Sequence, residues 1–308
     1  MAAIARTALD MWSSRGQDTA TLSSGCSSLD SVLQGGFRSG LLTEICGEAS
    51  AGKTQLCLQL LLQSCLSPSL GGLGGTACYI STEGLSSVKR LHDLGGVYQQ
   101  RYAGVLRKRR RDEMAGAGMA QSFLDNIFIE QIYEVAELVE FMVKASGVVC
   151  SAMFDVDSCF SIVVQARLPT LLAEHNTKLV IIDSVAAVFR LESTASVKEA
   201  SDRSRLMFHL ANCMRILSAQ FRAVFVVTNQ VTGNVMDGGV SFMSNRANQH
   251  KPALGLSWSN CINQRLMLHR TRRGGERRVE VVMSPYLPPS SASFQITTEG
   301  LVDVEVQE

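Results

Sequence analysis

The sequence of 308 residues predicts an α/β domain with a mainly parallel, twisted sheet, helices on both faces and an antiparallel extension toward the C-terminus. Two observations lead to this prediction. Short β-rich apolar runs alternate with helical patterns as far as Thr228, as expected for parallel strands joined by helices. Beyond Trp258 the pattern changes to strands joined by tight turns, which is typical of hairpins that extend one edge of a sheet.

The first elements lead into a glycine-rich loop. Residues 27–33 begin with hydroxyl side chains and are followed by two glycines, a pattern typical of a short helix with a glycine stop. A strand is expected over 41–46. The helix expected over 55–66 carries leucines on every face, so we expect it inside the core. Strand, glycine loop and buried helix stand in the order of a phosphate-binding unit.

The later elements repeat the alternation. Further strands are expected over 76–81, 126–130, 178–183 and 223–228. The intervening helices are expected over 85–102, 134–145, 159–175 and 199–221. Hairpin strands are expected over 262–269 and 277–283. The stretches 190–203 and 233–255 fit no regular element, and each follows a strong strand, which favours functional loops.

Composition limits the possible classes of protein. Apolar residues make up 46% of the chain and charged residues 19%, which indicates a globular protein with a sizeable core. The net charge is only +1, so any nucleic-acid binding has to come from local basic patches. The nine cysteines are scattered without a C-x-x-C spacing, which fits a reducing compartment. Because the chain has no signal-peptide pattern and no long uncharged apolar run, we expect a soluble intracellular protein without membrane association.

The central motif is a phosphate-binding loop with the pattern G-x-x-x-x-G-K-T. Its glycines let successive backbone N–H groups converge on nucleotide phosphates at the positive end of the next helix. Lys53 is expected to reach the phosphates, and the hydroxyl of Thr54 to hold magnesium. The alternative is a chance match. The residues expected to bind the nucleotide here are Gly47, Glu48, Ala49, Ser50, Ala51, Gly52, Lys53 and Thr54.

Three further polar sites follow predicted strands. Asp183 ends an apolar run and is expected beside the loop, where a carboxylate holds magnesium through water. Glu83 is placed to activate the water that attacks a γ-phosphate. The amides Asn229 and Gln230 open the stretch 233–255, where one of them is expected to sense the γ-phosphate. Each site also has a purely structural alternative. Asp183 would then simply end a buried strand, Glu83 would be a glutamate favoured at a helix N-terminus, and the amides would be turn residues.

The candidate nucleic-acid contacts are cations on or near the two irregular stretches, because phosphate contacts need basic side chains on backbone that follows a strand. These cations are Arg203, Arg205, Arg246 and Lys251. The basic run 107–111 fits either a nuclear localisation signal or a solvated charge cluster. The segment 271–278 is interpreted as an exposed hairpin with charged tips.

The motif series resembles the eukaryotic RecA-type recombinases and their paralogues. Segments 47–55, 79–84, 179–190, 226–231 and 251–258 share that family's order and spacing, and the resemblance covers about residues 20–302. It implies a RecA-like P-loop ATPase core over 21–306, preceded by a linker or docking segment over 1–20. It also implies ATP and Mg²⁺ as cofactors.

The resemblance further implies roles for single residues. Lys53, Glu83 and Gln230 would be catalytic, Thr54 and Asp183 would hold the metal, and Arg90 would stack on adenine. The stretches 190–203 and 233–255 match two DNA-facing loops. Ser284 and Pro285 match a segment that caps the ATP of a neighbouring protomer.

Three departures from the family pattern bear on assembly. Only about 20 residues precede the core, so the family's helical N-terminal domain is expected to be missing or trimmed from this chain. The docking segment appears as Ala5-Arg6-Thr7-Ala8, without its aromatic anchor. Asn260 stands where the strand-exchange recombinases carry a histidine that reaches a neighbour's γ-phosphate.

These departures favour an ATP-binding paralogue with weak hydrolysis that forms a heterodimer with a related paralogue. It would support the main recombinase on single-stranded or branched DNA during repair of double-strand breaks, in the nucleus with a cytoplasmic fraction. One alternative is a DNA-dependent ATPase that itself forms filaments and exchanges strands. A P-loop kinase or GTPase is a more distant alternative, because no N-K-x-D motif follows the loop.

Overall fold

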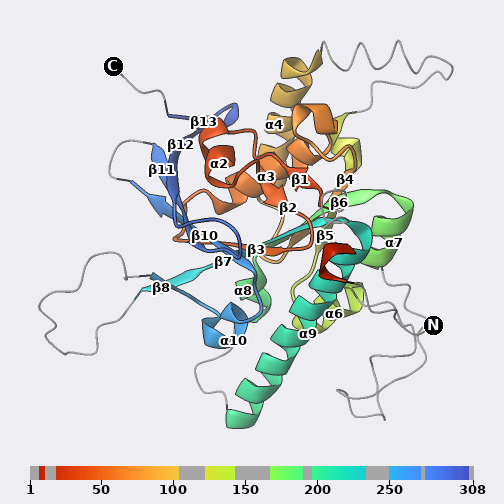
Figure 1. Cartoon of the computed structure of the whole chain (residues 1–308), viewed down its shortest axis with the longest axis vertical. Helices are drawn as coiled ribbons and strands as arrows, with labels where there is room; N and C mark the ends of the chain where they lie inside the picture. Colours follow the sequence, from red (N-terminus) through yellow and green to blue (C-terminus); the bar gives the residue numbers. More distant parts are fainter. Residues whose placement is uncertain are drawn as a thin grey trace, which may run out of the picture.

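In the part of the chain that the structure describes, nine strands form a central sheet (Figure 1). The computed structural model describes residues 7–10, 19–103, 122–142, 167–189, 196–233, 250–271 and 275–304. The strand order is β13-β12-β11-β10-β3-β7-β6-β4-β5. The parallel strands are β3 (Leu42–Gly47), β4 (Thr76–Ser81), β5 (Ile127–Gln131), β6 (Thr177–Asp183) and β7 (Val224–Asn229).

The antiparallel part extends the sheet at one edge. Strand β10 still runs parallel to β3, and β11, β12 and β13 then follow as antiparallel neighbours. Their bounds are β10 (Gln264–Arg270), β11 (Glu276–Met283), β12 (Ser291–Thr297) and β13 (Gly300–Asp303). The predicted fold class, including the antiparallel extension, is confirmed.

Helices cover both faces of this sheet. On one face lie α2 (Ser27–Val32), α3 (Lys53–Ser64) and α4 (Val88–Arg101). On the other lie α6 (Val135–Met142), α7 (Arg167–Glu174), α8 (Val185–Val188), α9 (Val197–Phe221) and α10 (Gly255–Ser259).

Strand β6 shows how the central strands serve both layers. Leu179 and Ile181 pack in the cluster with α3, whereas Val180 and Ile182 pack in the cluster with α9. All four side chains are fully buried. A strand covered on both faces is apolar at every position, and that is the pattern from which it was predicted.

The long helix α9 begins two residues before its predicted start. The Ser196 side chain accepts from the backbone N–H of Glu199, and the Glu199 carboxylate accepts from the backbone N–H of Ser196. This capping box satisfies N–H groups that lack partners in the first turn. The helix ends at Phe221, and the C-cap residue Arg222 adopts the left-handed conformation with φ of 53°.

Short elements complete the fold. Two small ladders join β1 (Thr21–Leu22) to β2 (Phe37–Arg38) and β8 (Val231–Gly233) to β9 (His250–Pro252). Single 3₁₀ turns are η1 (Pro68–Leu70) and η2 (Phe123–Asn126). The β8–β9 ladder brackets residues 234–249. These residues, the basic run 107–111 and the first part of stretch 190–203 lie outside the described residues. Within the described ranges, no helix has the length and apolarity to cross a membrane.

The C-terminal strand supplies the cap of helix α2. The Asp303 carboxylate accepts from the backbone N–H groups of Ser27 and Ser28, at 3.1 and 2.7 Å, and from Cys26 Sγ at 3.1 Å. Partial desolvation works to raise the pKa of Asp303, but the hydrogen bonds from Ser28, Cys26 and Ser27 outweigh it and hold the pKa well below its usual value. The carboxylate therefore stabilises the folded chain in its ionised form.

We expect Asp303→Ala to lower the free energy of unfolding by about 1 kcal/mol at pH 7, the typical cost of a lost helix cap. Because the pKa is lowered on folding, this contribution is present above about pH 4 and is lost as the pH falls through the lower pKa of the folded chain. Urea unfolding at pH 7 and in steps below pH 4 measures the loss of stability and its dependence on pH. A gap between wild type and variant that stays constant down to the acid limit would contradict this role.

Candidate functional site

The predicted phosphate loop joins strand β3 to helix α3. Ser50 and Gly52 adopt left-handed conformations, with φ of 62° and 106°. The backbone angle of Gly52 favours glycine, and a Cβ atom there would lie 2.8 Å from Cδ1 of Ile296, whose side chain would have to shift. The loop thus turns tightly before the helix, with its N–H groups available at the helix N-terminus.

Lys53 is the first residue of α3 and folds back across the loop. Its ammonium donates to the backbone oxygens of Gly47 at 2.7 Å and Glu48 at 2.9 Å. Burial lowers the pKa of Lys53, and the nearby charge of Asp183 opposes that shift. A partly desolvated cation is therefore held at the mouth of the loop, where an anionic ligand would meet it.

The two predicted magnesium ligands are neighbours. Thr54 Oγ1 donates to Asp183 Oδ2 over 2.8 Å. The same carboxylate accepts from the Tyr79 hydroxyl at 2.9 Å and from Thr228 Oγ1 at 2.5 Å. Burial, followed by the charge of Asp183, raises the pKa of Tyr79 well above its usual value, so this hydroxyl remains a donor. Tyr79 and Thr228, which were not predicted, fix the orientation of the carboxylate.

The predicted catalytic carboxylate and the predicted sensor also meet. Gln230 Nε2 donates to Glu83 Oε1 over 2.8 Å, and Ser184 Oγ lies 3.4 Å from the same oxygen. Glu83 follows β4 and Gln230 follows β7, so the carboxyl ends of two parallel strands bring them together. Asn229 is fully buried and turned toward the core, which leaves Gln230 as the amide at this edge.

A buried polar network beneath the loop was not predicted. Glu44, at 0% exposure in strand β3, accepts from Asn229 Nδ2 at 2.7 Å, from Trp258 Nε1 at 2.8 Å and from Arg265 Nε at 2.5 Å. Arg265 also donates to Ser259 Oγ. The network links the loop strand to β7, β10 and α10. It thereby connects strand β3, which leads into the phosphate loop, with β7 before residues 234–249 and with α10 after them.

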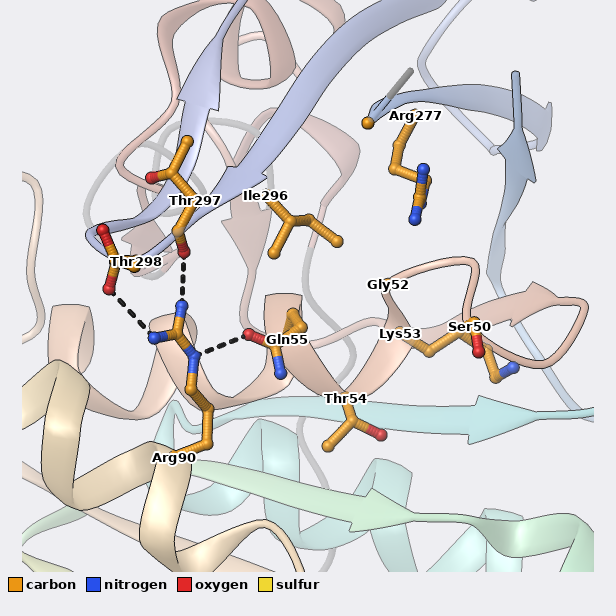
Figure 2. A pocket seen from close by; sticks show the side chains of 11 residues that line it. Ser50, Gly52, Lys53, Thr54, Gln55, Arg90, Arg277, Ile296, Thr297 and Thr298 are labelled. Atoms are coloured by element: carbon orange, nitrogen blue, oxygen red, sulfur yellow. Dashed lines mark hydrogen bonds between the residues drawn. The ribbon is translucent and has the colours of Figure 1, made fainter. Parts of the chain in front are cut away.

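The pocket in front of the loop has a volume of about 700 Å³. The phosphate loop, the start of α3, Arg90 of α4 and the antiparallel extension line it (Figure 2). Its described lining residues include three cations, Lys53, Arg90 and Arg277, and none with a carboxylate. The composition of this lining fits a polyanionic ligand such as a nucleotide.

Arg90 lies at one end of this pocket with its guanidinium fixed. It donates to Gln55 Oε1 at 3.0 Å and to the backbone oxygens of Thr297 and Thr298, at 2.5 and 2.9 Å (Figure 2). A guanidinium held in this way presents a planar cation to the pocket, the surface on which an aromatic base stacks. Its predicted role as an adenine contact stays a prediction.

The hairpin expected over 271–278 is confirmed, because β10 and β11 pair as antiparallel neighbours on either side of it. The expected exposure is wrong for one of its charged residues, since Arg277 is half-buried and lines the pocket. A signal was present, because Arg277 shares the strand parity of the buried Val279 and Val281. Residues 272–274 lie outside the described residues.

Other predicted site residues lie elsewhere. The described cations proposed for nucleic acid, Arg203, Arg205 and Lys251, are not among the residues that line the pocket, and Arg246 lies outside the described residues. Ser284 and Pro285 belong to the β11–β12 loop, where the Tyr286 hydroxyl bonds Gln264 at the start of β10. Because β10 is parallel to β3, this loop lies at the amino ends of the parallel strands, whereas the phosphate loop lies at their carboxyl ends.

Comparison of the sequence with known proteins shows similarity to one protein family. The Rad51 family model matches residues 15–168 and 130–304. A DNA repair protein XRCC3 homolog of Arabidopsis thaliana is 31% identical, over 92% of this chain and 93% of its own. DNA repair protein XRCC3 of Bos taurus is 35% identical, over 91% of this chain and 74% of its own. DNA repair protein RAD51 homolog 3 of Cricetulus griseus is 29% identical, over 91% of this chain and 68% of its own.

Proposed function

This chain belongs to the Rad51 family, and on that premise we propose that it is an ATP-binding recombinase paralogue that assembles with a related paralogue. In this role it assists homologous-recombination repair of DNA double-strand breaks by supporting the main recombinase on single-stranded DNA. The carboxylate-free pocket with its three cations in front of the phosphate loop carries the nucleotide part of the proposal. The names of the similar repair proteins support the repair part.

ATP with Mg²⁺ is the proposed ligand of this pocket. The phosphate-loop N–H groups and Lys53 would bind the phosphates, and Arg90 the adenine. Thr54 and Asp183, whose side-chain oxygens are 2.8 Å apart, would hold Mg²⁺, which offsets phosphate charge when bound. Tyr79 and Thr228 would keep the Asp183 carboxylate turned toward this position.

Hydrolysis at this site is proposed to be weak. Glu83 would orient the attacking water, and Gln230 would report the γ-phosphate to the β8–β9 ladder and the residues that it brackets. In the structure Gln230 Nε2 donates to Glu83, so one amide engages the carboxylate that is proposed to act on water. We propose that this contact has to break before Glu83 can accept a proton from water.

Assembly with another protomer is the proposed output of ATP binding. The loop with Ser284 and Pro285 lies at the amino ends of the parallel strands, away from the chain's own phosphate loop at their carboxyl ends. Any nucleotide that this loop caps would therefore be a neighbour's. The docking segment lacks an aromatic residue, and Asn260 stands where the strand-exchange recombinases carry a histidine. These features favour a heterodimer over a homofilament. DNA contact through the stretches 190–203 and 233–255 and a nuclear location, with a cytoplasmic fraction, belong to the same proposal.

We expect the purified full-length chain, with ATP, Mg²⁺ and single-stranded DNA, to hydrolyse ATP slowly and to form no long filament. The reason is that two of the family's inter-protomer contacts lack their usual side chains in this sequence. Negative-stain electron microscopy and phosphate release measure the two properties, with a strand-exchange recombinase as the positive control. Regular homofilaments would favour the alternative function, a filament-forming DNA-dependent ATPase.

A further inference from the structure

Arg277 lies in the pocket at a position that the nucleotide motif does not explain. It extends from strand β11 of the antiparallel extension, on the far wall from Arg90 and above the loop residues Ser50 and Gly52 (Figure 2). Lys53 lines the same end of the pocket. Two cations from distant parts of the chain therefore face one space.

The guanidinium of Arg277 is poorly satisfied there. Its Nη1 donates to the backbone oxygen of Glu276 at 3.0 Å, and its buried Nε has no hydrogen-bond partner among the described residues. Nor does a described carboxylate form an ion pair with it. A partly buried guanidinium normally has an anionic partner, because leaving its donors unpaired costs free energy.

The neighbouring cation makes this arrangement more unfavourable. Lys53 is itself half-buried and lines the same pocket as Arg277 (Figure 2). Two like charges that face one low-dielectric pocket repel each other unless an anion lies between them. A polyphosphate meets both requirements, since it carries several charges and accepts the forked hydrogen bonds of a guanidinium.

We propose that Arg277 is a phosphate-binding residue that acts in cis, so that the nucleotide is held between the phosphate loop and strand β11 of one chain. This inference rests on the proposed nucleotide site and adds a residue from outside its motifs. The contact of Ile296 with Gly52 brings β12, the strand that pairs with β11, against the loop. The extension therefore forms the second wall of the phosphate end, and the chain binds nucleotide without a partner.

The adjacent residue offers a matched control. Arg278 has the same side chain and lies on the same strand, but it points to the opposite face and is exposed. Its Nη2 donates to Ser291 Oγ over 2.9 Å, and it does not line the pocket. Removing the charge of Arg277 or of Arg278 changes the net charge of the chain equally. A difference in nucleotide binding between the two variants therefore reports a direct contact of Arg277 with the nucleotide.

The test is nucleotide binding by the full-length chain, measured by isothermal titration with ATP, ADP and adenosine in the presence of Mg²⁺. We expect Arg277→Gln to weaken ATP and ADP binding about tenfold or more and to leave adenosine affinity unchanged. Arg278→Gln is expected to stay within about twofold of wild type for all three ligands. Arg277→Lys, which keeps the charge and loses the fork, should fall between wild type and the glutamine variant.

Equal ATP affinity for wild type and Arg277→Gln would overturn the inference, and so would an equal loss for adenosine. Arg277→Met, which keeps the aliphatic stem, provides the same comparison should the glutamine variant fail to fold. A wild-type chain that bound none of the three ligands would contradict the proposed nucleotide site itself. Wild-type binding with an unaffected Arg277→Gln would overturn the role of Arg277 alone.

Discussion

Replacing Lys53 by alanine is expected to weaken ATP binding by at least about a hundredfold, because a charge-assisted contact to each of two phosphates is lost. In the structure the Lys53 ammonium is held by the backbone oxygens of Gly47 and Glu48 at the mouth of the loop. It is therefore already positioned for the ligand, and alanine leaves no cation in its place. Arg90 and Arg277 remain in the pocket but act on its other walls.

The shift of the melting temperature with ATP measures this effect, since a ligand that binds the native state stabilises it by mass action. Wild type should show a shift that grows with ATP concentration, and Lys53→Ala should show none in the same range. Lys89→Ala is the matched control, because Lys89 is exposed on α4 next to Arg90 and does not line the pocket. A shift of wild-type size in Lys53→Ala would contradict the proposed role of the loop.

The largest expected effect on stability comes from Arg265→Met. This change leaves the fully buried Glu44 carboxylate without its cation, and breaking a buried pair in this way typically costs about 3–5 kcal/mol. The N–H donors of Asn229 and Trp258 remain, but they do not supply a compensating charge. Methionine keeps much of the arginine's volume, so the loss reports the charge and not a cavity.

Urea unfolding of the full-length chain measures this cost. Arg101→Ala is the control, because the Arg101–Glu299 pair is solvent-exposed and such pairs contribute about 1 kcal/mol or less. The double variant Glu44→Gln/Arg265→Met removes both charges and should recover part of the loss. An Arg265→Met variant as stable as Arg101→Ala would show that the network contributes little to stability.

Much of the sheet could be predicted because its strands are covered on both faces. The bounds of β4 match the expected strand, and β6 begins one residue earlier than expected. The start of α9 was placed two residues late, because the predicted start ignored the capping box that Ser196 forms with Glu199. Local sequence encodes such elements, so periodicity and capping residues are sufficient to find them.

The polar partners inside the site could not be predicted in the same way. Glu44 lies in a fully buried strand, and its partners Asn229, Trp258 and Arg265 are more than 180 residues away in the sequence. Only the packing of β3 between β7 and β10 brings them together. Thr54 was predicted from the phosphate-loop motif and Asp183 from the apolar strand that it ends, whereas no motif marks Tyr79 or Thr228.

We propose that ATP bound at this loop governs assembly with a related paralogue, and co-purification from cells tests this proposal. Tagged wild-type chain and Lys53→Ala should be captured at equal abundance, and the co-purifying Rad51-family chain identified and quantified by mass spectrometry. We expect wild type to retain a related paralogue in near-equal amount and Lys53→Ala to retain severalfold less. Equal retention by both would contradict the claim, since the loop would then bind its ligand without controlling assembly.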